Sequence, residues 1–150
     1  MQSLERDVET LRNIPLFAGL PTARLKLIAY TAEIVRFEPG EVIVRQGAPA
    51  DAAYIIVEGE AEVWITDTAG NNIRVATLGA HSLLGEVAIL ARSHRTATVQ
   101  AKDPVVAFKI SANVFLDLVR QCPDIGMQVM TVLAQRLERT AALLQQHDRR

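Results

Sequence analysis

Residues 84–99 read LGEVAILARSHRTATV and combine a glycine, a carboxylate and a guanidinium within a short distance. Gly85-Glu86 opens an apolar segment that predicts a short helix, and the free backbone N–H groups at a helix start suit an anion. Arg95 adds a planar fork of donors that matches a phosphate. Glu86 would repel an anion unless its carboxylate accepts a hydrogen bond from a hydroxyl of the same ligand. The stretch therefore indicates a ligand with one phosphate-like anion and a nearby hydroxyl, such as a sugar phosphate or a nucleotide.

A purely structural explanation fits the same two residues. Glu86 and Arg95 could form a salt bridge at the edge of a loop, with no ligand involved. Because short motifs match by chance often, these residues alone do not decide between the two explanations.

The composition limits the class of protein. With 150 residues, 49% of them hydrophobic, the chain is large enough for one domain with a proper core. A net charge of −1 lacks the basic excess typical of domains that bind nucleic-acid phosphates. There is no signal peptide and no apolar run near ~20 residues, so we expect a cytoplasmic protein without a membrane partner. The single cysteine, Cys122, excludes an internal disulfide.

The segment from about 33 to 110 predicts short strands. Glycine or proline turn signals separate apolar stretches every ten residues or so, which indicates an antiparallel sandwich or barrel rather than a doubly wound sheet. We expect a mainly β fold, a double-stranded β-helix or jelly-roll barrel, flanked by helices. The turn signals lie at Pro39-Gly40, Gln46-Gly47, Glu58-Gly59, Ala69 to Asn72 and Lys102 to Pro104. The expected helices cover residues 3–13, 22–32, 111–119 and 123–146.

Two of these helices carry readable faces. In the helix over 22–32, the predicted apolar face consists of Leu25, Leu27, Ile28 and Ala32. In the helix over 123–146, a stripe of Ile125, Val129 and Val132 is expected to face the domain. A second stripe follows alternating steps of three and four residues, typical of a coiled-coil seam: Met130, Leu133, Leu137, Thr140 or Ala141, and Leu144. We therefore expect a homodimer through residues 124–146, with packing of one broad stripe on the parent domain as the alternative.

Together these patterns resemble the cyclic nucleotide-binding domain family, which occurs in bacterial catabolite activators, in regulatory subunits of cyclic-nucleotide-dependent kinases and in gated ion channels. The phosphate-binding cassette of that family reads Phe-Gly-Glu-Leu/Ile-Ala-Leu, a short loop, and Arg-Ala/Ser/Thr-Ala-Thr/Ser-Val. Residues 84–89 and 95–99 match it, with Leu84 in place of the usual phenylalanine as an equivalent apolar plug. The resemblance covers nearly the whole chain and implies one domain over residues 1–150.

The resemblance implies a 3′,5′-cyclic nucleotide as the ligand, with cyclic AMP favoured and cyclic GMP possible. Glu86 matches the residue that takes the ribose 2′-hydroxyl, and Arg95 matches the residue that pairs with the cyclic phosphate. Backbone N–H groups after Gly85 would complete the phosphate site. They belong to Val87, Ala88 and Ile89.

The resemblance also points to the base. Thr96 would bond a phosphate oxygen or, as in cyclic-GMP-selective relatives, the guanine amino group. Counting forward from Arg95 places Thr140 on the base-contacting threonine of the activator type. Ala141 lacks the hydroxyl that the activators use to reach across their dimer.

The resulting hypothesis is a non-catalytic sensor with no cofactor and no metal. A Crp-type transcription regulator is the alternative, and it would need a helix-turn-helix beyond the long helix, for which these residues leave no room. A metal enzyme on a similar barrel is disfavoured because His81, His94 and His147 are isolated in the sequence. Arg92 and His94 are expected to be solvated loop residues, although Arg92 could add a phosphate contact.

Overall fold

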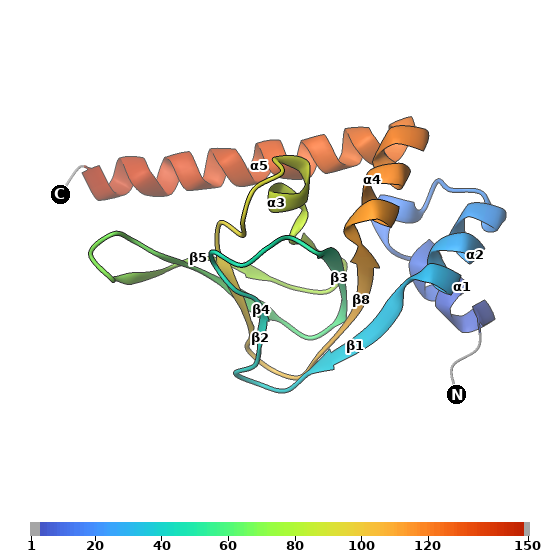
Figure 1. Cartoon of the computed structure of the whole chain (residues 1–150), viewed down its shortest axis with the longest axis horizontal. Helices are drawn as coiled ribbons and strands as arrows, with labels where there is room; N and C mark the ends of the chain where they lie inside the picture. The colour runs from blue at the N-terminus through green and yellow to red at the C-terminus, as the bar shows by residue number, and fades with distance from the viewer. Residues whose placement is uncertain (1–3, 149–150) are drawn as a thin grey trace.

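The computed structural model describes residues 4–148, without the side chains of residues 144 and 146–148. Its centre is a pair of four-stranded antiparallel sheets, with strand orders β1-β8-β3-β6 and β2-β7-β4-β5 (Figure 1). The strands are β1 (Glu33–Phe37), β2 (Val42–Val44), β3 (Ala52–Glu58), β4 (Ala61–Thr66), β5 (Asn72–Leu78), β6 (Leu83–Leu84), β7 (Thr98–Ala101) and β8 (Val105–Ser111). The mainly β, jelly-roll-type fold expected from the turn signals is confirmed.

The sheet that contains β3 and β8 is covered on both faces. Residues 52–56 read AAYII without a polar alternation, and all five are buried. Such an uninterrupted apolar run is expected where both faces of a strand are covered. Tyr54 and Ile56 point into the core between the two sheets, whereas Ala53 and Ile55 belong to a second core under the helices.

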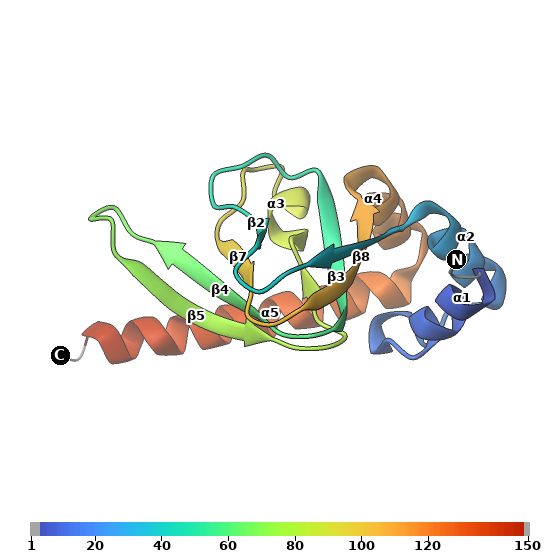
Figure 2. The same cartoon turned by 90° about the horizontal axis from the view of Figure 1, so that it is seen from below.

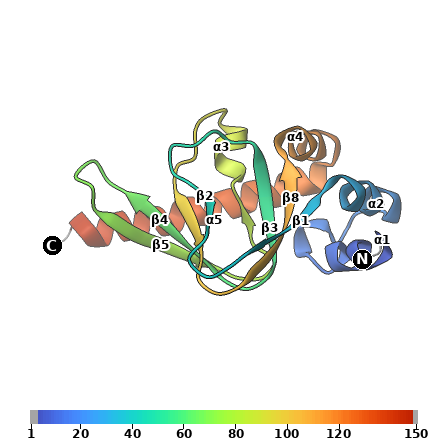
Figure 3. The same cartoon turned by 60° about the horizontal axis from the view of Figure 1, so that its bottom comes forward.

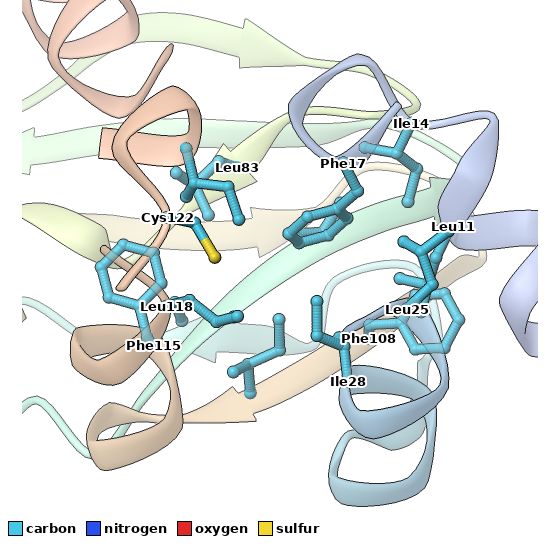
Figure 4. Packing of buried hydrophobic residues seen from close by; sticks show 14 of the residues in the cluster. Leu11, Ile14, Phe17, Leu25, Ile28, Leu83, Phe108, Phe115, Leu118 and Cys122 are labelled. Carbon is cyan, nitrogen blue, oxygen red and sulfur yellow. The ribbon is translucent and has the colours of Figure 1, made fainter. Parts of the chain in front are cut away.

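The second core joins the helices to the outer face of that sheet. Its side chains come from α1 (Leu4–Arg12), the 3-10 turn η1 (Pro15–Phe17), α2 (Thr22–Thr31), α4 (Ala112–Gln121) and α5 (Pro123–Asp148). Figure 4 shows how they meet, with Phe17 and Leu25 approaching from one side and Phe115 and Leu118 from the other. Cys122 is buried among them as a small apolar residue. This core fixes the start of α5 against the sheet.

One residue that was expected on the apolar face of α2 is exposed. Leu25 and Ile28 are buried, but Leu27 is 54% exposed, so its assignment to the apolar face was wrong. Leu27 follows Leu25 by two positions, which correspond to a rotation of about 200° at 3.6 residues per turn. Leu27 therefore lies on the side of the helix opposite the buried Leu25. Ala32 lies just past the end of α2 and packs only partly against the core.

The helix α5 extends well beyond the core. Its 26 residues correspond to about 39 Å at 1.5 Å per residue. Ile125 and Val129 are buried as predicted, while Met130 and Leu137 are 57% and 70% exposed. Leu133 is half-buried against the core, and the side chain of Leu144 lies outside the described residues.

The β4–β5 hairpin projects in the same direction as the last turns of α5 (Figures 1 and 2). Its turn is closed by Asp67, whose carboxylate accepts from the backbone N–H groups of Ala69 and Asn71 at 3.0 and 2.8 Å. The expected hairpin is therefore present. A short helix, α3 (Glu86–Leu90), lies away from the hairpin turn (Figure 3), and Glu86 at its start is bonded to Arg136 of α5. Hairpin, α3 and α5 form the surroundings of the site.

Candidate functional site

A cavity of about 180 Å³ lies between the cassette, the β4–β5 hairpin and α5. Seven of the eight predicted site residues line it: Gly85, Glu86, Val87, Ala88, Arg95, Thr96 and Thr140. The eighth, Ile89, was predicted for its backbone N–H, and its side chain packs into the core under the helices. The cavity thus gathers residues that are far apart in the sequence.

Gly85 gives the cassette its shape. It caps the N-terminus of α3 in the left-handed region, with φ 85°. A Cβ at this position would lie 2.7 Å from Nη1 of Arg95 and 3.2 Å from the carbonyl oxygen of Ala52. A side chain would therefore meet both backbone strain and the Arg95 guanidinium, so glycine lets Arg95 pass close to the helix start.

Arg95 is 4% exposed and is held by backbone carbonyls. Its Nη1 donates to the Gly85 oxygen and its Nη2 to the Ala52 oxygen, both at 2.6 Å, and Nη2 also reaches Asp51 at 3.3 Å. A guanidinium has five N–H donors, so these bonds orient the group and leave donors for an anion. Asp51 is 70% exposed, which makes its ion pair with Arg95 weak in water.

Glu86 is completely buried. Burial raises the pKa of its carboxyl group, against the lowering effect of the nearby Arg136 guanidinium. Its Oε1 accepts from Nη1 of Arg136 at 2.5 Å. Its Oε2 has no hydrogen-bond partner among the described residues. Because a buried polar oxygen without a partner costs free energy, the wall of this cavity presents an acceptor that a ligand hydroxyl can satisfy.

The loop-edge salt bridge between Glu86 and Arg95 does not occur in the described part of the chain. Each residue has another ion-pair partner, Arg136 for Glu86 and Asp51 for Arg95, and both are buried rather than at an edge. The structural explanation considered from the sequence was therefore wrong. Both groups are positioned around a cavity instead.

Arg136 is a site residue that the sequence reasoning missed. It reaches from α5 to Glu86 and also donates to the carbonyl oxygen of Leu83. Its position four residues before Thr140 places both on one face of the helix, which was the available signal. Arg136 links the long helix directly to the cassette.

The remaining lining is apolar on the hairpin side and positive overall. Side chains of β4 and β5, among them Val63, Ile65 and Val75, form one wall. Three arginines, Arg95, Arg136 and Arg139, line the cavity together with one acidic residue, Glu86. An excess of positive charge in a concave site favours an anionic ligand. The arrangement suits a molecule with an anion, a hydroxyl and a flat apolar part.

The other residues considered from the sequence lie outside this cavity. Arg92 and His94 are exposed on the cassette loop, and neither lines the cavity. Within the described residues, no group of three or more potential metal ligands is present. Among the helices of residues 4–148, none has the length and apolar character needed to cross a membrane.

Comparison with known proteins places this geometry in a family. The family model of the cyclic nucleotide-binding domain matches residues 34–122. A Rhodopseudomonas palustris protein that is named as a candidate potassium channel is 30% identical over 131 residues, which is 87% of this chain and 31% of that protein. The chain therefore spans about a third of the length of this relative.

Solved structures agree. A mutant regulatory subunit of a cAMP-independent protein kinase A from Trypanosoma brucei, bound to cAMP in its A site, is 29% identical, with a TM-score of 0.79. The match covers 94% of this chain and 51% of that one. The catabolite activator protein of Thermus thermophilus is 25% identical with a TM-score of 0.76, over 89% and 63% of the two chains. Since the family model spans more than half of the sequence, the chain belongs to the cyclic nucleotide-binding domain family.

Proposed function

We propose that this chain is a non-catalytic sensor that binds a 3′,5′-cyclic nucleotide, with cyclic AMP favoured and cyclic GMP as a second ligand. In this proposal Glu86 takes the ribose 2′-hydroxyl, and Arg95 pairs with the cyclic phosphate. The backbone N–H groups of Val87, Ala88 and Ile89, at the start of α3, add to the phosphate site. Thr96 bonds the phosphate or the base, and Thr140 contacts the base.

The observation that carries the proposal is the free Oε2 of a completely buried Glu86, beside a cavity that Arg95 also lines. A carboxylate in an anion site needs a hydroxyl donor on the ligand, and a cyclic nucleotide retains its 2′-hydroxyl. The apolar wall from β4 and β5 offers a face for the purine. The cAMP bound to the mutant Trypanosoma brucei regulatory subunit supports cyclic AMP as the first ligand to test.

The output of the sensor would pass through α5. Arg136 joins this helix to Glu86, and Thr140 lies on the same helix beside the cavity. A nucleotide that contacts both the cassette and Thr140 would hold α5 against the domain. It can shift the position of the helix only by its difference in affinity for the two arrangements.

A homodimer through the 124–146 helix remains part of the proposal. Met127, Met130 and Leu137 are between 57% and 70% exposed on α5, and Leu143 is 43% exposed. Such exposed apolar residues on one helix are expected to be covered by a partner. The alternative function is the ligand-binding and dimerisation part of a Crp-type transcription regulator, and the relation to the Thermus thermophilus activator favours considering it.

Calorimetric titration of the protein with cyclic AMP, cyclic GMP and 5′-AMP tests the proposed function. We expect saturable 1:1 binding of cyclic AMP per chain and much weaker binding of 5′-AMP, whose open phosphate carries a second charge and does not fit the same hydroxyl and phosphate geometry. Light scattering on the same samples gives the oligomeric mass with and without ligand. Absence of binding by both cyclic nucleotides to folded protein would refute the proposal.

A further inference from the structure

The last turns of α5 bring two adjacent residues of opposite hydrogen-bonding character to the cavity. Arg139 and Thr140 both line it, on the part of the helix that continues beyond the Arg136–Glu86 contact. Thr140 lies four residues past Arg136, about 6 Å along the helix axis. If Glu86 holds the ribose, these two residues lie towards the base. Any role of Arg139 and Thr140 in reading the base therefore rests on the proposed function.

Thr140 offers an acceptor to the base. Its Oγ1 lies 3.0 Å from the carbonyl oxygen of Arg136, so the single hydroxyl hydrogen is donated within the helix. The lone pairs of Oγ1 remain for a donor on the ligand. Among purines, the 6-amino group of adenine is such a donor, whereas guanine carries an acceptor oxygen at the same position.

Arg139 offers only donors. Its side chain is exposed at the mouth of the cavity and makes no hydrogen bond or ion pair with any side chain that the structure describes. Arg136, one turn earlier, is already engaged by Glu86 and the Leu83 carbonyl. Arg139 is thus the guanidinium of this helix that is available to a ligand. The fork of an arginine matches the O6 and N7 acceptors of guanine with two bonds, and adenine offers it only N7.

We propose that Arg139 is a specificity-determining residue that reads the O6/N7 edge of a 6-oxopurine and so extends the site to cyclic GMP. Thr140, next to it, reads the amino group of cyclic AMP. The two residues have opposite preferences, and together they make the site accept both bases. Removing the Arg139 guanidinium therefore shifts the specificity of the site towards cyclic AMP.

The test compares cyclic AMP, cyclic GMP and cyclic IMP by calorimetry on the wild type and on Arg139→Gln. Cyclic IMP carries O6 and N7 but lacks the 2-amino group, so it separates the contribution of Arg139 to base recognition from that of Thr96. We expect Arg139→Gln to weaken the binding of cyclic GMP and cyclic IMP by about 5- to 150-fold, the range of one bidentate base contact, and that of cyclic AMP by less than about threefold. Arg139→Lys keeps the charge without the fork and is expected to recover only part of the loss.

Two matched variants complete the design. Thr96→Ala is expected to change the affinities for cyclic IMP and cyclic AMP by the same factor, because neither nucleotide has a 2-amino group and both carry the same cyclic phosphate. Thr140→Val removes the acceptor and is expected to weaken cyclic AMP more than cyclic IMP. Circular dichroism establishes that each variant is folded before it is titrated.

Equal weakening of all three nucleotides by Arg139→Gln would overturn the inference, since it would mean that Arg139 acts through its charge or by stacking. Unchanged affinity for all three would overturn it as well, since Arg139 would then be only a solvated residue. Failure of the wild type to bind any of the three is a different result, and it contradicts the proposed function itself.

Discussion

Arg95→Ala is expected to weaken cyclic AMP binding by about 2–5 kcal/mol, the usual cost of truncating one partner of a buried, hydrogen-bonded charge pair. The guanidinium is 4% exposed and is oriented by the carbonyl groups of Gly85 and Ala52. Its remaining donors therefore meet the phosphate with little loss of side-chain freedom. Calorimetric titration of wild type and variant measures the difference.

A control is needed because Arg95 also satisfies two backbone carbonyls, so the variant can lose stability as well as affinity. Adenosine, which lacks the phosphate, provides it. If Arg95 pairs with the phosphate, wild type and variant bind adenosine with nearly equal affinity, and only cyclic AMP distinguishes them. A variant that weakens adenosine and cyclic AMP by the same factor would show that Arg95 supports the fold and not the phosphate.

Arg136→Met is expected to lower the free energy of unfolding of the ligand-free protein by about 2–4 kcal/mol at neutral pH. Glu86 is completely buried and would lose its ion-pair partner, while methionine keeps most of the apolar stem of the arginine. The estimate is below that of a fully buried pair because the Arg136 side chain is 30% exposed. Urea unfolding measures the loss. The double variant Glu86→Gln with Arg136→Met should recover most of it, because no unpaired charge is left buried.

The stability deficit of Arg136→Met is expected to depend on pH. Burial already raises the pKa of Glu86 above its ordinary value of 4.5, and the Arg136 guanidinium opposes this shift, so removal of Arg136 raises the pKa of Glu86 further. A group with a higher pKa in the folded state than in the unfolded state binds its proton more tightly when the protein is folded. The free energy of unfolding then falls as pH rises through the interval between the two pKa values. The deficit of Arg136→Met is therefore smaller near pH 5 than near pH 8. A deficit that is the same at both, or that persists in the Glu86→Gln background, would disprove this role for the ion pair.

The cassette was readable from the sequence because its parts are local. Gly85, Glu86 and Arg95 lie within eleven consecutive residues, and the short helix and strand that hold them follow from the apolar pattern around them. Their convergence on one cavity could be anticipated for that reason. The jelly-roll-type fold was readable from turn signals between short strands.

The partners of these residues were not readable. Arg136 reaches Glu86 across 50 positions and Asp51 reaches Arg95 across 44, so both contacts depend on how α5 and β3 pack and not on a local pattern. The direction of a side chain on a helix was also difficult to predict from the sequence, as the exposed Leu27 shows. The spacing of Arg136 and Thr140 places both on one face of α5, but nothing in the sequence pairs that face with the carboxylate of Glu86.

The most direct test of the account is the affinity of the protein for cyclic AMP against 2′-deoxy cyclic AMP, measured by calorimetry on the wild type and on Glu86→Gln. The free Oε2 of Glu86 is proposed to accept the 2′-hydroxyl, and one hydrogen bond to a charged group contributes about 1.5–3 kcal/mol. We expect the wild type to bind the deoxy analogue about 12- to 150-fold more weakly than cyclic AMP, by conversion of that range. We also expect Glu86→Gln to discriminate much less between them. Equal affinity of the wild type for both nucleotides would contradict the account.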